Sequence, residues 1–161
     1  MTMQRVVESP IGLLVVVADE RGVTALHWPT SAPSSAVGGD PKGHAGASAV
    51  LDRAQRQLDE YFAGTRRSFD LPLHPVGTPF QLGVWEVLRG IDYGTTITYG
   101  EQARRLGSPT AVRAVGGANG RNPIGIIVPC HRVVGSDGSL TGFAGGVERK
   151  RWLLDFERAN A

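Results

Sequence analysis

The hydrophobic pattern of this chain changes period near residues 74–78, and that change sets the fold class. Upstream, short apolar runs separated by turn residues predict a three-stranded antiparallel meander. Its expected strands are residues 6–8, 13–18 and 23–28. Downstream, apolar residues recur at helical spacing. We therefore expect an α+β protein of two small domains, residues 1–76 and residues 77–161.

The first domain contains three more segments. Residues 30–48 are rich in Ser, Pro, Gly and Ala without an apolar period, which predicts a flexible loop. Residues 50–62 carry apolar side chains at helical spacing, and Gly64 is placed to end that helix. Residues 69–73 predict an edge strand, because Pro72 cannot donate a hydrogen bond to a neighbouring strand.

The second domain is predicted to be mostly helical. Thr78 and Pro79 are typical of a helix start, an N-cap followed by proline at the first helical position. Further helices are expected at residues 99–106, 110–117 and 147–157. The first two of these are joined by a turn that contains glycine, which is typical of a helix-turn-helix. Ser108 and Pro109 are expected to cap the second.

The second helix of that pair is unusually poor in side chains. Gly116 and Gly117 each cost about 1 kcal/mol relative to alanine. Close helix packing, the end of the helix, or close approach of the backbone to a partner would each explain them. A major-groove helix carries long polar side chains, whereas this one has only Arg113. It therefore suits the narrower minor groove, where recognition is by shape and backbone.

Composition narrows the functional classes. The formal net charge of +2 and the isoelectric point near 9.0 are compatible with nucleic-acid binding without requiring it. No apolar stretch is long enough to span a membrane, and residues 1–5 show no signal-peptide pattern, so we expect a cytoplasmic protein. The single cysteine excludes an internal disulfide and a multi-cysteine zinc site.

That cysteine, Cys130, follows an apolar run over residues 126–128 that is expected to be strand-like. Pro129 restricts the backbone before it, and His131 follows directly. A neighbouring histidine can lower the pKa of a thiol and favour the reactive thiolate. The triplet indicates a nucleophile, and a core cysteine beside a hydrogen-bonded histidine is the alternative.

Several motifs occur together in a fixed order. They are Arg113-Ala114-Val115-Gly116-Gly117-Ala118, Asn122-Pro123, Pro129-Cys130-His131-Arg132-Val133, Thr141-Gly142-Phe143-Ala144-Gly145-Gly146, Arg149-Lys150 and Glu157. In this order they resemble the O6-alkylguanine-DNA alkyltransferases, also called methylated-DNA–protein-cysteine methyltransferases. The resemblance covers residues 78–157, and the N-terminal half matches in layout. It implies a ribonuclease H-like N-terminal domain and a winged-helix-like helix-turn-helix domain.

The resemblance implies direct DNA repair. Cys130 would attack the alkyl carbon on guanine O6, or on thymine O4, while His131 takes the thiol proton through a water and Glu157 orients the histidine. The product is a stable thioether, so the protein would act once per molecule and need no cofactor. Its partner would be double-stranded DNA containing O6-alkylguanine, with the damaged base flipped out from the minor groove.

Other positions match residues that the family uses to bind DNA and the base. Asn122 resembles the hinge asparagine that ties the recognition helix to the active-site turn, and Tyr99 resembles a tyrosine that can donate to guanine N3. Arg113 resembles the finger that fills the gap left by the flipped nucleotide. The other implied DNA contacts are Ala111, Val112, Ala114, Gly116 and Gly117. The implied base pocket consists of Tyr99, Val133, Phe143 and Ala144.

The sequence departs from the family at one pocket position. Phe143 stands where many relatives carry a tyrosine, whose hydroxyl could hydrogen-bond near O6, so we expect activity with an altered rate or substrate range. No metal is expected, because the remaining candidate ligands lack metal-ligand spacing and are interpreted as structural or surface residues. These are His27, His44 and His74.

Three other functions are weighed against the alkyltransferase. A non-catalytic sensor of alkyl lesions would share the DNA-binding half but lack the cysteine. A helix-turn-helix transcription factor would prefer a DNA sequence, and a Cys-His hydrolase would turn over repeatedly. The protein is expected to be a monomer, with clustering on DNA left open, and to have no membrane partner.

Overall fold

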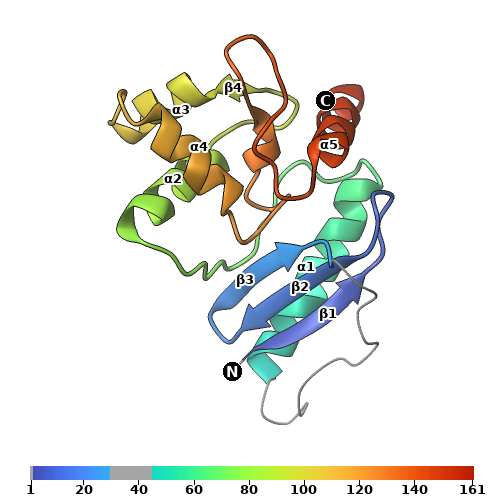
Figure 1. The fold of residues 1–161 in the computed structure, drawn as a ribbon. Coiled ribbons are helices and arrows are strands. Elements are labelled where there is room, and N and C mark those ends of the chain that lie inside the picture. The colour runs from blue at the N-terminus through green and yellow to red at the C-terminus, as the bar shows by residue number, and fades with distance from the viewer. Residues whose placement is uncertain (1, 30–44) are drawn as a thin grey trace. The chain divides into compact units, whose positions relative to one another are not determined.

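The structure, a computed structural model, describes residues 2–29 and 45–161. Its contacts divide the chain into two compact units, Met1–Val76 and Gly77–Ala161 (Figure 1). The first unit holds a three-stranded sheet and one helix, and the second is mostly helical. The chain is therefore an α+β protein, as its sequence predicts.

A three-stranded antiparallel sheet forms the centre of the first unit. Its strands are β1 (Met3–Val7), β2 (Leu14–Asp19) and β3 (Gly22–His27), in the order β1-β2-β3. This is the meander predicted from the turn residues between the apolar runs. Leu14 and Val16 of the middle strand are at most 1% exposed, and their two-residue spacing places them on the same face.

Helix α1 (Ala45–Phe62) covers this sheet (Figure 1). Leu51, Ala54 and Leu58 form its apolar stripe and are at most 1% exposed. The helix begins earlier than predicted, since residues 45–48 are helical and not part of a loop. Ala47 in this added turn is fully buried, and its burial stabilises the turn. The rest of the predicted loop, residues 30–44, lies outside the described residues.

Residues 69–73 do not form the predicted edge strand. The segment makes one isolated parallel bridge to β3, where Val23 N donates to Pro72 O at 2.9 Å. Upstream, the backbone N–H of Asp70 donates to the side chain of Gln57 in α1 at 2.9 Å. The segment therefore satisfies part of its backbone with a helix side chain rather than with a strand ladder.

Helix α2 (Pro79–Arg89) opens the second unit with a reciprocal capping box. The hydroxyl of Thr78 accepts from Gln81 N at 3.1 Å, and Thr78 N donates to the Gln81 side chain at 3.0 Å. An N-cap of this kind stabilises a helix by about 1 kcal/mol. The helix start predicted from Thr78 and Pro79 is confirmed.

Helices α3 (Tyr99–Leu106) and α4 (Val112–Gly120) form the predicted helical pair. α3 ends at Gly107, whose φ of 84° is the left-handed conformation that favours glycine. α4 begins two residues later than predicted and continues beyond Gly117. Ser108 does not cap this helix as predicted, because the N-cap is Ala111, whose side chain makes no hydrogen bond. Ser108 belongs to the preceding turn, in which its carbonyl oxygen accepts from Ala111 N at 2.9 Å.

The apolar run at residues 126–128 is not a strand. Ile126 has a left-handed φ of 69°, and Val128 N donates to Ile124 O at 3.0 Å, so the run folds into tight turns. An alternating or apolar run predicts strand geometry only where a neighbouring strand is available to pair with it. Here, local backbone carbonyls accept from the N–H groups of the run, and the Asn122 side chain donates to its last carbonyl.

Regular pairing resumes just after the cysteine. β5 (Val133–Val134) pairs in parallel with β4 (Ile97–Thr98), the segment that leads into α3. Helix α5 (Val147–Asn160) ends the chain and extends three residues beyond the predicted helix. Its buried stripe faces the short helix that contains Cys130.

Candidate active site

The predicted nucleophile, Cys130, begins a short 3₁₀ helix, η1 (Cys130–Arg132), and is 5% exposed. The turn before it is held by Asn122. The Asn122 amide donates to Val128 O at 2.8 Å, and its side-chain carbonyl accepts from Ile124 N at 3.0 Å. The same side chain lies within hydrogen-bonding reach of the Cys130 thiol. Asn122, predicted as a hinge residue, therefore shapes the turn that presents the sulfur.

A buried network surrounds Glu157 of α5. Its carboxylate accepts from His131 Nε2 at 2.7 Å and from Arg132 Nε at 2.8 Å and Nη2 at 3.0 Å. The backbone N–H of Gly94 adds a longer contact at 3.4 Å. Arg132 also donates through Nη1 to Ile91 O at 2.7 Å. The bonds from His131 and Arg132 to Glu157 fasten η1 to α5, and those of Gly94 and Ile91 tie both to the segment after α2.

The charges in this network decide which atom can accept a proton. Burial alone would raise the pKa of Glu157, but the hydrogen bonds from His131 and Arg132 outweigh burial and hold that pKa well below its usual range. Glu157 is therefore ionised, and a carboxylate can only accept, so Nε2 of His131 carries the hydrogen. Burial lowers the pKa of His131 although Glu157 acts to raise it. The ring is neutral, and its free lone pair is on Nδ1.

That atom, His131 Nδ1, is buried and has no hydrogen-bond partner among the residues the structure describes. Leaving a buried acceptor unsatisfied costs about 1–3 kcal/mol, and proteins commonly satisfy such atoms with an ordered water or a ligand. The adjacent residue is Cys130. The arrangement can thus take a thiol proton at Nδ1 while Glu157 stabilises the resulting imidazolium.

The Cys130 thiol lies in an environment with opposing effects. Burial raises the pKa of the thiol above its ordinary value, while the hydrogen bond with Asn122 and the positive charge of Lys150 oppose that rise. Lys150 is itself fully buried, and its Nζ donates to Thr141 O at 2.8 Å. Burial lowers the pKa of Lys150, and a thiolate at Cys130 would raise it. The resting form is the thiol, and Lys150 stabilises the thiolate once a base removes the proton.

Tyr99 meets Lys150 at the same carbonyl. The Tyr99 hydroxyl donates to Thr141 O at 3.0 Å, so this oxygen accepts from both side chains. Lys150 Nζ lies 5.8 Å from the centroid of the Tyr99 ring. Burial raises the pKa of Tyr99, and the Thr141 bond opposes the rise. The hydroxyl therefore stays protonated near neutral pH and is available as a donor close to Cys130.

The other residues of the implied base pocket differ in exposure. Val133 is fully buried in β5, Phe143 is half-buried and Ala144 is exposed. Gly142 links them to Tyr99: it has a φ of 67°, and a Cβ there would lie 3.1 Å from the Tyr99 hydroxyl. The close approach of this segment to Tyr99 therefore requires glycine.

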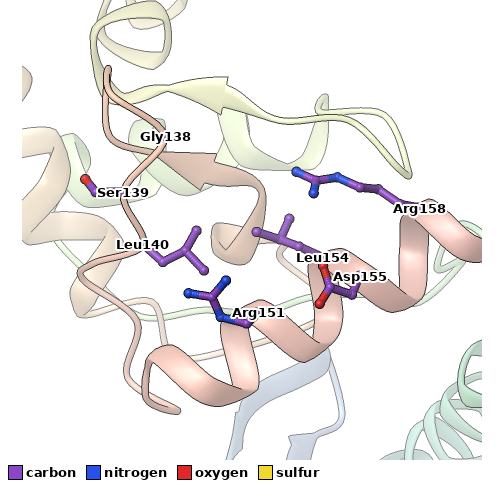
Figure 2. Close-up of a pocket in the computed structure, with 7 residues that line it drawn as sticks. All are labelled: Gly138, Ser139, Leu140, Arg151, Leu154, Asp155 and Arg158. Atoms are coloured by element: carbon purple, nitrogen blue, oxygen red, sulfur yellow. The ribbon is translucent and has the colours of Figure 1, made fainter.

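A separate pocket lies between α5 and residues 138–140 (Figure 2). Its lining residues are Gly138, Ser139, Leu140, Arg151, Leu154, Asp155 and Arg158. None of the residues predicted to act on DNA or on the alkyl group lines it. This pocket is therefore distinct from the surroundings of Cys130.

Helix α4 exposes most of the predicted DNA-contacting positions. Arg113, Ala114 and Gly117 are exposed, and Val112 is 39% exposed, whereas Ala111 and Gly116 are half-buried. A Cβ added at Gly117 would meet nothing within 4 Å, and one at Gly116 would make only an ordinary contact of 3.8 Å with Tyr99. Close packing does not explain these glycines, and neither does the helix end, since α4 continues to Gly120. Close approach of the backbone to a partner stays a prediction for these two glycines.

Sequence reasoning did not assign roles to Arg132 and Lys150. A signal for Lys150 was available: the buried residues of α5 are Lys150, Leu153, Leu154 and Glu157, which follow one helical stripe. Two charged residues on the buried side of a helix indicate a polar site rather than plain core. Arg132 gave no such signal, because η1 is too short to show a periodicity.

Among residues 2–29 and 45–161, no group of three or more His, Cys, Asp or Glu side chains is arranged to hold a metal ion. His74 is paired instead with Asp19, with Nδ1 and Oδ2 2.7 Å apart. His27 is exposed at the end of β3, and His44 lies outside the described residues. None of the helices in the described part of the chain is both long and apolar enough to cross a membrane.

Two family models together match nearly the whole chain. The DNA-binding domain of 6-O-methylguanine DNA methyltransferase matches residues 79–159, and the ribonuclease-like domain of the same family matches residues 3–75. These matches agree with the fold class implied by the motif resemblance.

Individual relatives match over similar lengths. The methylated-DNA–protein-cysteine methyltransferase of Methanosarcina acetivorans is 47% identical over 150 residues, covering 93% of this chain and 94% of the relative. The Mycobacterium tuberculosis protein of that name is 46% identical over 169 residues, covering 98% and 93%. The solved structure of Mycobacterium tuberculosis OGT in complex with DNA matches with a TM-score of 0.85 at 44% identity, covering 98% of this chain and 94% of that one. The chain belongs to the 6-O-methylguanine DNA methyltransferase family.

Proposed function

We propose that this protein is a methylated-DNA–protein-cysteine methyltransferase that moves an alkyl group from guanine O6 in DNA to Sγ of Cys130. One observation carries the proposal: the buried cysteine is followed by a neutral histidine whose Nδ1 is unsatisfied and whose Nε2 is bonded to an ionised glutamate. A nucleophile, a base and a group that orients the base are the parts of an activated nucleophile.

The chemistry balances with these residues. The thiol proton of Cys130 passes through a bridging water to His131 Nδ1, and Glu157 stabilises the imidazolium that forms. The thiolate, stabilised by the charge of Lys150, attacks the alkyl carbon. A C–S bond forms as the C–O6 bond breaks, and the electron pair of the broken bond goes to the guanine. The base leaves as guanine once it takes up one proton.

Tyr99 is the proposed donor to the leaving guanine, at N3. In the structure its hydroxyl is bonded to Thr141 O at 3.0 Å, so binding of the base exchanges this bond for one to the base. Lys150 Nζ, at 2.8 Å, continues to satisfy the Thr141 carbonyl after the exchange. The exchange therefore leaves the Thr141 carbonyl with a donor, which keeps its cost low.

DNA is the proposed macromolecular partner. The matched family model is a DNA-binding domain, and one solved relative is in complex with DNA. α4 offers exposed Arg113 and open backbone at Gly117, which suits a minor groove read by shape. A sulfur that is nearly buried cannot reach O6 inside a base pair, so we propose that the damaged nucleotide flips out and that Arg113 fills the gap.

The reaction is proposed to occur once per molecule. A thioether is stable, and with a single cysteine in the chain there is no second thiol to take part in its removal. O4-alkylthymine, which carries the same kind of alkyl ether, is a proposed second substrate. No cofactor is required by these steps. The monomeric state, clustering on DNA and cytoplasmic location stay predictions from the sequence.

The test is peptide mapping by mass spectrometry after incubation with excess duplex DNA that contains O6-methylguanine. We expect one methyl group per protein, on Cys130, and an equal loss of lesion from the DNA. Cys130→Ser is expected to bind the same duplex without accepting the methyl. A methyl on another residue, or repair of more than one equivalent, would contradict the proposal. Unmodified wild-type protein that still binds the lesion would point instead to a non-catalytic sensor.

A further inference from the structure

Two amide side chains are buried face to face between the helices of the helix-turn-helix. Gln102 of α3 is fully buried, and Asn119 in the last turn of α4 is 1% exposed. Gln102 Nε2 donates to Asn119 Oδ1 at 2.8 Å, and Asn119 Nδ2 donates to Gln102 Oε1 at 2.6 Å. Each amide thus satisfies the other, and neither belongs to the network around Glu157. Buried polar pairs of this kind fix one arrangement of the elements they join, because any other leaves unsatisfied groups.

Helix α4 needs such an anchor. Its N-cap, Ala111, makes no side-chain hydrogen bond, and three glycines within the helix lower its intrinsic stability. Hydrogen bonds from side chains of α2 and α3 reach two consecutive residues in its C-terminal half, Ala118 and Asn119. Trp85 Nε1 of α2 donates to Ala118 O at 2.9 Å, and the amide pair follows at the next residue. Apolar contact at Val115 alone would allow α4 to rotate or slide.

The anchored side of α4 is opposite its open side. Arg113, Gly117 and Gly120 are exposed and spaced at i, i+4 and i+7, so they lie along one face. A rotation of about 20° moves a group on a helix surface of ~5 Å radius by about 2 Å. That displacement is enough to break a hydrogen bond, whose donor and acceptor are about 3 Å apart. Contact between this face and DNA therefore depends on the rotation of α4.

We infer that Gln102 and Asn119 are positioning residues for DNA recognition: their reciprocal hydrogen bonds fix the rotation of α4, so that Arg113 and the glycine backbone meet the DNA. The inference rests on the proposed function. Neither side chain touches DNA or the reacting atoms. Cys130 is held instead by Asn122 and by the bonds between η1 and α5. Loss of the amide pair should therefore weaken DNA binding far more than it changes the intrinsic reactivity of the thiol.

The experiment replaces the pair with apolar side chains of similar volume, Gln102→Leu with Asn119→Leu. Three quantities are measured: the Kd for undamaged duplex DNA, the rate of methyl transfer from lesion duplex at subsaturating concentration, and the rate of Cys130 alkylation by iodoacetamide without DNA. We expect the Kd to rise and the transfer rate to fall by about tenfold or more, and the iodoacetamide rate to stay within about twofold. The midpoint of unfolding should be unchanged or higher, because apolar replacement of a buried polar pair is often neutral or stabilising.

Two further variants show whether the bonds or only the packing matter. The exchange Gln102→Asn with Asn119→Gln keeps both amides and should restore DNA binding to within about threefold of wild type. Asn119→Asp keeps the shape of the side chain but removes its donor, so it should raise the Kd for duplex DNA. This variant tests the hydrogen bonds independently of whether the double leucine variant folds. Gln57→Leu removes a buried amide of the first unit, which is 2% exposed, and should leave the Kd unchanged.

The outcomes separate this inference from the proposed function. An unchanged Kd in the leucine variant, or equal losses of DNA binding and iodoacetamide reactivity, would overturn the positioning role. Failure of wild-type protein to accept a methyl group on Cys130 would overturn the proposed function, while the comparison of Kd values among variants would still test the inference.

Discussion

Glu157→Gln keeps the shape of the side chain and removes its charge. In the structure the carboxylate accepts three short hydrogen bonds, one from His131 and two from Arg132. The ion pair is buried, since the Glu157 side chain is 1% exposed and the Arg132 side chain is 8% exposed. The glutamine can accept at one oxygen only, so Arg132 becomes a buried charge without a counter-ion. Removing one partner of a buried ion pair costs about 3–5 kcal/mol, a large part of the ~5–15 kcal/mol that stabilises a domain. We expect the free energy of unfolding to fall by about 3–5 kcal/mol.

The matched control is Glu101→Gln. Glu101 also pairs with two arginines, Arg104 at 2.7 Å and Arg105 at 3.3 Å, but its side chain is 36% exposed. Water screens such pairs, so this variant should differ little from wild type. The assay is urea unfolding followed by tryptophan fluorescence, in a Trp28→Phe background so that only tryptophans of the second unit report. Equal losses in the two glutamine variants would refute the account of the buried network.

The same substitution should slow alkyl transfer. Glu157 acts to raise the pKa of His131, so its loss makes the ring a weaker base and removes the group that stabilises the imidazolium. A positioned base contributes about 10²–10⁴-fold to a rate, and we expect Glu157→Gln to lose about tenfold or more of the transfer rate. DNA binding should be unchanged, since the network does not include α4. A variant that binds DNA normally and transfers at the wild-type rate would contradict the role given to Glu157.

Three other substitutions test separate parts of the site. Burial raises the pKa of Cys130 above its ordinary value of 9.0, and Lys150 opposes the rise. The rate at which iodoacetamide alkylates wild-type protein should therefore increase with pH through a midpoint above 9.0, and Lys150→Met should move that midpoint higher. An unchanged midpoint would exclude Lys150 as the charge that stabilises the thiolate. Phe143→Tyr should retain activity and alter the rate or the alkyl-size preference, measured with O6-methylguanine and larger O6-alkylguanines in duplex DNA. Identical values for this variant and wild type would refute a role for position 143. Gly117→Ala should stabilise the free protein by up to about 1 kcal/mol, because its Cβ meets nothing within 4 Å. The same variant should weaken DNA binding, and an unaltered affinity in titrations with duplex DNA would refute the close approach of DNA to Gly117.

Local signals in the sequence predicted local structure well. The start of α2 follows from Thr78 and Pro79, an N-cap and a proline at the first helical position, which are neighbours in the chain. The two incorrect strands failed for one shared reason. At residues 69–73 and 126–128 a side-chain amide competes for backbone groups, from Gln57 in the first case and from Asn122 in the second. Hydrophobic pattern carries no information about such competition.

The candidate site was predicted unevenly for a similar reason. Cys130, His131 and Glu157 were expected from motif order, and the structure brings them together. Lys150 belongs to the motif order without a predicted role of its own, and its electrostatic interaction with the cysteine depends on how α5 packs against η1. The amide pair of α3 and α4 joins residues 17 positions apart, and nothing in the pattern of either helix predicts it.

The sequence by itself led to the predicted nucleophile, a single cysteine between Pro129 and His131, and to DNA as the predicted partner of a helix with too few side chains to read a major groove. Only the tertiary structure decided the protonation state of the site. A pKa depends on solvent exposure and on the distance to other charges, and both are set by packing between segments far apart in the chain. That packing keeps His131 neutral with Nδ1 available, and it brings the charge of Lys150 within electrostatic reach of the Cys130 thiol.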